Sequence, residues 1–127
     1  DSMIVFAPSV IADRLMALSR ALDAGGAGGK ILLYGGTRPA AGAAASGPLV
    51  TFTLPWPCLA GVTDSTLTLQ NPDPAMATAT GTVTWARFTD STGAWVLDCD
   101  AGGLIDVAGA VQAGGEVTLT LASLSEV

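Results

Sequence analysis

The sequence contains no histidine. This absence excludes the Ser-His-Asp and Cys-His catalytic arrangements and removes the commonest metal-binding side chain. It also leaves no side chain whose ordinary pKa suits proton transfer near neutral pH. A pair of carboxylates is the catalytic arrangement that stays open. We therefore expect that the protein is not an enzyme and that it binds no cofactor and no metal.

Basic residues are scarce: the chain has 5 Lys and Arg against 11 Asp and Glu, a net charge of −6. Binding to nucleic acid or to an anionic membrane depends on clustered basic side chains, and those of this chain are scattered. They are Arg14, Arg20, Lys30, Arg38 and Arg87. We expect neither nucleic acid nor a membrane as a partner. Only 13% of the residues are charged, against about 25% in ordinary domains, which suggests that a partner covers part of the surface.

Long apolar runs are absent, so the sequence predicts no membrane span, and its first residues lack the basic start of a signal peptide. Cysteine is limited to Cys58 and Cys99. They could form one disulfide or remain two buried thiols, and we favour thiols because small secreted disulfide scaffolds usually carry more cysteines. The length of 127 residues fits a single domain, 1–127.

The chain opens with a short apolar arm, residues 1–8, followed by a predicted helix at Val10–Asp23. The arm contains Met3, Ile4, Val5 and Phe6. Ser9 is the expected N-cap, and Asp13 is expected in the first turn, where it favours the helix dipole. The apolar stripe of the helix consists of Ile11, Leu15, Leu18 and Leu22. A glycine-rich run at 24–29 ends the helix.

From Lys30 onward the apolar residues alternate with a period of two, which predicts strands. The predicted strands are 30–34, 49–54, 66–70, 81–89, 94–98, 104–107 and 116–121. A turn at Asp90–Gly93 joins two of them in a hairpin, and a long loop at 35–48 is of the kind that often carries function. We predict an all-β fold, a two-sheet, jelly-roll-like β-sandwich with one N-terminal α-helix and with strands over 30–127.

Three motifs invite a functional interpretation. Gly25–Lys30 resembles a phosphate-binding loop, but the order of helix and strand is reversed and the residue after Lys30 is Ile31. A flexible helix-to-strand connection is the preferred interpretation. Asp98, Asp100 and Asp106 could gather near a metal, although they do not match a calcium loop. We interpret them as solvated carboxylates near a turn, and a glycosidase pair among the aspartates has no better support.

The tryptophans suggest a third possibility. An exposed aromatic platform would indicate a carbohydrate-binding module. Trp85 and Trp95 lie on the two strands of the predicted hairpin and are more simply explained as core or interface anchors. Trp56, between Pro55 and Pro57, is the better candidate for an exposed contact with a partner.

Three segments carry a resemblance to a known group. They are Arg14–Pro39, with its helix, glycine run and I-x-x-Y-x-G-x-R-P-like strand and turn; Gly81–Gly93, with W-x-R-hydrophobic-x-D; and Ala113–Thr120, with G-G-x-V-x-L-T. Together they resemble small structural proteins of tailed-bacteriophage virions, over about half of the chain. The Pro55–Cys58 insert and the apolar arm depart from this pattern. They leave open whether the protein belongs to the head or to the tail of the virion.

The resemblance implies a structural role, most simply a capsid cement (decoration) protein that is assembled in the host cytoplasm and lies on the head surface of the virion. The expected partners are the major capsid protein and a second copy in a homodimer. We expect the partner contacts at Met3, Ile4, Val5, Phe6, Arg38, Pro39 and Trp56. A tail or fibre component, a carbohydrate-binding module and a carboxylate enzyme are the alternatives.

Overall fold

The computed structural model of the chain describes residues 7–40, 42–45, 47–62, 66–100, 105–106, 110–121 and 124–125. Its first element is helix α1, Pro8–Asp23, which begins before the predicted Val10. The N-cap is Ala7 and no side chain caps the helix, so the prediction of Ser9 as N-cap is wrong. Pro8 occupies the start because its φ is already helical and it has no N–H to satisfy. Asp13 consequently lies beyond the first turn.

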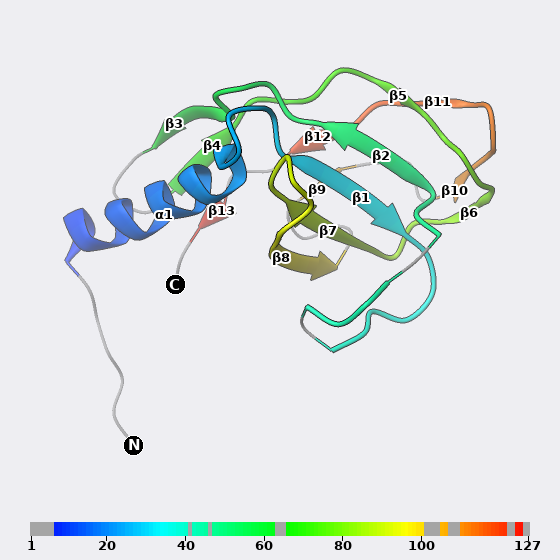
Figure 1. Ribbon diagram of the computed structural model, residues 1–127, viewed down its shortest axis with the longest axis horizontal. Helices are drawn as coiled ribbons and strands as arrows, with labels where there is room; N and C mark the ends of the chain where they lie inside the picture. The colour runs from blue at the N-terminus through cyan, green and yellow to red at the C-terminus, as the bar shows by residue number, and fades with distance from the viewer. Residues whose placement is uncertain are drawn as a thin grey trace.

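The largest sheet has four antiparallel strands in the order β2-β1-β7-β8 (Figure 1). The strands are β1 (Lys30–Tyr34), β2 (Val50–Thr53), β7 (Trp85–Thr89) and β8 (Trp95–Asp100). The predicted strand 30–34 is confirmed, and so is the hairpin of β7 and β8 with its turn at Asp90–Gly93, where Gly93 has a φ of +91°. The register shifts at the Thr89 end of this hairpin and leaves Val96 as the extra residue of a β-bulge.

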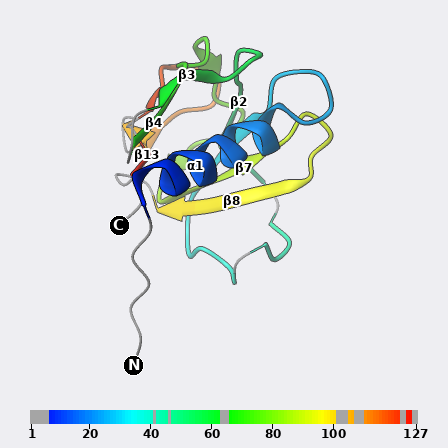
Figure 2. The same cartoon turned by 90° about the vertical axis from the view of Figure 1, so that its left-hand side faces the viewer.

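A second, three-stranded sheet lies beside α1 in the order β13-β4-β3 (Figure 2). Its strands are β3 (Leu59–Val62), β4 (Thr66–Leu69) and β13 (Leu124–Ser125). The sequence analysis identified β4 but not β3 or β13. Leu15 and Leu22 of the helix stripe are buried, in one hydrophobic cluster with Cys58, Leu67 and Leu69.

Three short ladders complete the described structure: β5–β11, β6–β10 and β9–β12. Their strands are β5 (Ala75–Met76), β6 (Gly81–Thr82), β9 (Ile105–Asp106), β10 (Ala110–Val111), β11 (Glu116–Val117) and β12 (Thr120–Leu121). The continuous strands predicted at 81–89 and 116–121 are therefore wrong. Each is divided because its two halves pair with different partners: β6 with β10 and β7 with β1, β11 with β5 and β12 with β9.

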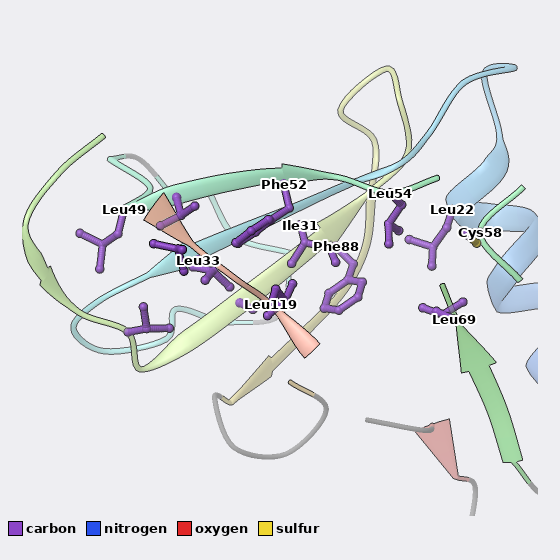
Figure 3. Packing of buried hydrophobic residues seen from close by; sticks show 14 of the residues in the cluster. Leu22, Ile31, Leu33, Leu49, Phe52, Leu54, Cys58, Leu69, Phe88 and Leu119 are labelled. Atoms are coloured by element: carbon purple, nitrogen blue, oxygen red, sulfur yellow. The ribbon is translucent and has the colours of Figure 1, made fainter. Parts of the chain in front are cut away.

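The chain is thus mostly β, with one helix and several antiparallel sheets in its described part. The core lies against one face of the four-stranded sheet, where Ile31, Leu33, Phe52 and Phe88 are buried (Figure 3). Val117 and Leu119, from the C-terminal part, belong to the same cluster. The opposite face of the sheet carries the residues described below.

The glycine run between α1 and β1 is closely packed at its end, at Gly28 and Gly29, whereas the space around Gly26 is open. A Cβ on Gly28 would collide with the backbone oxygen of Leu54, and one on Gly29 would lie 2.7 Å from the backbone oxygens of Leu22 and Thr89. The carbonyl of Gly29 also accepts a hydrogen bond from the amide of Leu54, at 2.8 Å. Glycine is needed here because three backbone segments meet.

Candidate functional site

A groove of about 500 Å³ lies between the loop 35–48 and strand β8. Its lining is Arg38, Pro39 and Ala40 from the loop, and Trp95, Val96, Leu97 and Asp98 from the strand. We call it the β8 groove. Its volume lies in the range of ordinary ligand pockets. Two of the residues expected to contact a partner, Arg38 and Pro39, are therefore brought together with Trp95.

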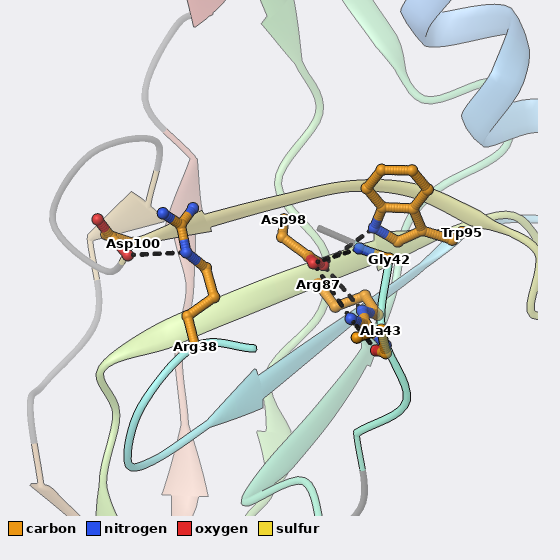
Figure 4. A network of polar contacts seen from close by, with 7 residues as sticks. All are labelled: Arg38, Gly42, Ala43, Arg87, Trp95, Asp98 and Asp100. Carbon is orange, nitrogen blue, oxygen red and sulfur yellow. Dashed lines mark hydrogen bonds and ion pairs between the residues drawn. The ribbon is translucent and has the colours of Figure 1, made fainter. Parts of the chain in front are cut away.

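Asp98 connects residues from the two strands and from the loop at this groove (Figure 4). Its Oδ1 accepts hydrogen bonds from Arg87 Nε at 2.8 Å and from Trp95 Nε1 at 3.1 Å. Its Oδ2 accepts from Arg87 Nη2 at 3.1 Å and from the amide of Gly42 at 3.3 Å. Both carboxylate oxygens are thus occupied, which indicates that Asp98 organises the site rather than binds a ligand.

The same cluster fastens the loop to the sheet. Arg87 Nη2 also donates to the carbonyl of Ala43 at 2.6 Å, so one guanidinium joins the loop, β7 and β8. Gly42 has a φ of +74°, and a Cβ there would lie 3.2 Å from the Trp95 ring. The loop therefore approaches the tryptophan closely only because this residue is glycine.

The ionisation of Asp98 follows from these contacts. Burial opposes the charged form, but the hydrogen bonds from Arg87, Gly42 and Trp95 outweigh it and hold the pKa of Asp98 below its usual range. The hydrogen bond to Asp98 raises the pKa of Arg87. The pair is consequently ionised at neutral pH, and the prediction that Asp98 is a solvated carboxylate is wrong, since its side chain is only 3% exposed.

An aromatic stack continues the cluster across the outer face of the sheet. The rings of Tyr34 and Trp85 are stacked with their centroids 4.4 Å apart, and Arg87 Cζ lies 5.4 Å from the Trp85 centroid. Burial raises the pKa of the Tyr34 hydroxyl. Trp85 is only 3% exposed, so it is an anchor within the molecule, whereas Trp95 is 47% exposed and lines the groove.

Arg38 lies at the other end of the groove from Trp95 and pairs with Asp100, with Nε and Oδ1 3.4 Å apart (Figure 4). Both side chains are exposed, so this pair contributes little to stability. Pro39 is half-buried beside Arg38.

Trp56 lies elsewhere, at the C-terminal end of α1. It is 57% exposed, and its Nε1 donates to the carbonyl of Asp23 at 3.2 Å. The side chain of Asp23 in turn accepts from the amide of Cys58 at 3.0 Å. Trp56 is exposed as expected for a contact residue, but it does not line the β8 groove. Met3, Ile4, Val5 and Phe6 lie outside the described residues, so their contact role stays a prediction.

The cysteines are free thiols, and the alternative of a disulfide between them is wrong. Burial raises the pKa of Cys58 to about 12 and that of Cys99 to about 11. Both are therefore protonated at neutral pH, and a protonated thiol is a weak nucleophile. Among the residues that the structure describes, no three or more His, Cys, Asp or Glu side chains are placed to hold a metal. Within the same residues, no helix has the length and apolar character of a membrane span.

The sequence analysis missed the roles of Arg87, Trp95 and Gly42 in the groove. The hairpin was predicted, but it does not reveal the pairing of Arg87 with Asp98, because the bulge at Val96 sets the register that places them opposite each other. The contribution of Gly42 had no signal either, since nothing in the loop sequence fixes which face of the sheet it covers.

No protein-family model matches this chain, and neither the curated proteins nor the solved structures contain one that is significantly similar to it.

Proposed function

We propose that this chain is a structural protein of a tailed-bacteriophage virion, a cement protein that binds the major capsid protein on the head surface and stabilises the mature head. The observation that carries the proposal is the contact between two of the segments behind the resemblance. Tyr34, of the strand-and-turn motif, stacks on Trp85, of the W-x-R motif. Two of the segments that resemble the phage proteins therefore pack against each other, as expected if they belong to one architecture rather than to unrelated turns.

The composition of the surface also supports a role in which the protein packs against a partner. Outward-facing strand positions carry uncharged threonines, such as Thr51, Thr53, Thr68 and Thr82, all exposed. A charge content of 13% lowers the desolvation penalty of burying such a surface against a partner. Binding to the mature lattice alone would stabilise that lattice by mass action.

The finer fold assignment is part of the proposal. Val111 of the ladder β6–β10, Val117 of the ladder β5–β11 and Leu119, which lies between β11 and β12, belong to the core that the four-stranded sheet also lines. Two layers around one core are the arrangement of a sandwich. We propose a jelly-roll-like sandwich in which these ladders form the second layer, and an experimental structure would test it.

The deciding experiment is co-sedimentation of the purified chain with mature capsids, unexpanded shells and isolated tails. Stoichiometric binding to mature capsids alone would support the cement role. Binding to tails alone would assign the chain to the tail or fibre instead. An Arg38→Ala/Trp95→Ala variant tests whether the β8 groove is the contact, and Trp56→Ala tests the other exposed residue that was expected to contact a partner. Met76→Ala, at a position that is 66% exposed and was not expected to make a contact, is the control.

A carbohydrate-binding module is the second candidate, and the exposed Trp95 beside the groove favours it. The buried Trp85 counts against an extended aromatic platform. A glycan array with the wild-type chain and Trp95→Ala would test this candidate, because a sugar that stacks on Trp95 would lose its binding in the variant.

A further inference from the structure

Strand β8 ends the four-stranded sheet, and no described strand pairs with its outer side. An edge strand presents a row of unpaired backbone N–H and C=O groups, which is a template for another strand. Proteins often use such an edge to bind an extended segment through main-chain hydrogen bonds. The β8 groove runs along this edge, since four consecutive residues of β8, Trp95–Asp98, line it.

The lining of the groove is mostly apolar, and its charges are balanced. Trp95 is half-exposed, Val96 and Leu97 are half-buried and also pack against the core, and each carboxylate of β8 already has a basic partner. Asp98 is paired with Arg87 and Asp100 with Arg38. Such a surface favours an uncharged, apolar, extended segment, because neither a basic nor an acidic segment finds an unpaired charge there.

The chain itself contains such a segment: residues 2–7, Ser-Met-Ile-Val-Phe-Ala, are uncharged and precede α1. Six residues in a strand span about 20 Å, and β8 has 6 residues. We propose that residues 2–7 of a second copy add as a strand to the edge of β8 and occupy the β8 groove. This inference shares with the proposed function only the expectation of a dimer and does not depend on a phage partner.

Two observations favour a second copy over the same chain. Ala7 is extended, with φ −62° and ψ 148°, and the following Pro8 favours that conformation. The apolar residues before it, Met3–Phe6, include none of the residue types that favour turns. A sequence of this kind is suited to extend to a neighbour, and a mutual exchange of arms between two copies gives a closed twofold dimer.

Disulfide trapping tests the proposal in the full-length chain. All variants carry Cys99→Ser, so that Cys58, which is buried, is the sole remaining native thiol. Chains with Ile4→Cys are mixed with chains with Ala40→Cys, in the groove, or with Ala60→Cys, an exposed control position on β3. We expect cross-linked dimers of Ile4→Cys with Ala40→Cys and little product with Ala60→Cys. Equal yields, or a bond that closes within a single chain carrying both Ile4→Cys and Ala40→Cys, would overturn the proposal.

A competition experiment provides a second measurement that needs no altered protein. A synthetic peptide of residues 1–8 should convert the dimer of the full-length chain to monomer in light scattering. The same peptide with Val5→Pro should compete about tenfold less well, because proline removes a ladder hydrogen bond worth about 1.4 kcal/mol. A dimer unaffected by either peptide, or a chain that is monomeric without any peptide, would contradict the inference.

Discussion

Arg87 and Asp98 face each other across β7 and β8, with Arg87 Nε 2.8 Å from Asp98 Oδ1. The side chains are 11% and 3% exposed, and Arg87 also reaches the loop through the carbonyl of Ala43. The pair therefore connects the edge of the sheet, its neighbouring strand and the wall of the groove.

Removing one member of this pair should be strongly destabilising. We expect Arg87→Ala to lower the free energy of unfolding by about 3 kcal/mol, because it leaves the buried Asp98 carboxylate without its cation. Urea denaturation followed by circular dichroism would measure the loss. Arg38→Ala is the matched control, since its exposed pair with Asp100 should be worth less than about 1 kcal/mol. Equal losses in the two variants would contradict the structural role of Arg87.

The free energy of unfolding should also depend on pH in the acid range. The pKa of Asp98 is lowered in the folded state, so its contribution is fully present above the unfolded value of about 3.9 and is lost as the pH falls through the folded pKa. The free energy of unfolding should therefore decrease below about pH 5, and Asp98→Asn should reduce this dependence.

Asp90 should also contribute to the dependence of stability on pH, because a hydrogen bond from the Thr92 hydroxyl lowers the pKa of Asp90 as well. A variant of Asp90 is therefore needed beside the variant of Asp98. Denaturation of wild type, Asp98→Asn and Asp90→Asn across the acid range separates the two contributions. An Asp98→Asn variant with the wild-type dependence on pH would show that Asp98 contributes nothing to it.

The two tryptophans of the hairpin should differ sharply in their contributions to the free energy of unfolding. Trp85→Ala should cost about 3–5 kcal/mol, as expected for a buried aromatic residue, together with its stacking on Tyr34. Trp95→Ala removes a half-exposed ring and one hydrogen bond to Asp98, so we expect about 1 kcal/mol. Denaturant titration of both variants checks the order, and a larger loss for Trp95 would contradict it.

Glycine 29 should tolerate no side chain. Gly29→Ala places a methyl group against the backbone oxygens of Leu22 and Thr89, and overpacking of this kind costs about 1–3 kcal/mol. Gly61→Ala is the control, because the space around that position is open. Thermal unfolding should show a lower Tm for Gly29→Ala than for Gly61→Ala, and equal values would refute the close packing.

The thiols should react slowly in the native protein. The pKa of Cys58 is raised to about 12 and that of Cys99 to about 11, so little thiolate exists at neutral pH. A colorimetric thiol reagent at pH 8 should label both rapidly in denaturant and far more slowly in the folded chain. Fast labelling of the folded chain at both positions would contradict these environments.

The longer elements could be predicted from the sequence because their periodicity extends over several residues. The stripe of α1, strand β1 and the β7–β8 hairpin each combine a regular apolar pattern with clear turn chemistry. β3 was missed because Ala60 and Gly61 give no alternation and because prolines precede it. The two-residue strands are too short for any period, and their pairing is decided by contacts distant in the chain.

The site was predicted in part. Arg38 and Pro39 do line the groove, since they follow a confirmed strand. Trp95 was treated as an anchor equivalent to Trp85, although the bulge at Val96 and the edge position of β8 leave it exposed. A bulge changes the face to which a side chain points, and alternation alone cannot reveal it.

The order of the core residues along the chain has a consequence for synthesis on the ribosome. The helix and the four-stranded sheet are complete at Asp100, whereas Val111, Val117 and Leu119, which share the core, come later. A nascent chain that has just released β8 therefore holds a formed sheet whose apolar side, with Phe52 and Phe88, is incompletely covered. During this interval the growing polypeptide is most exposed to aggregation and to capture by chaperones.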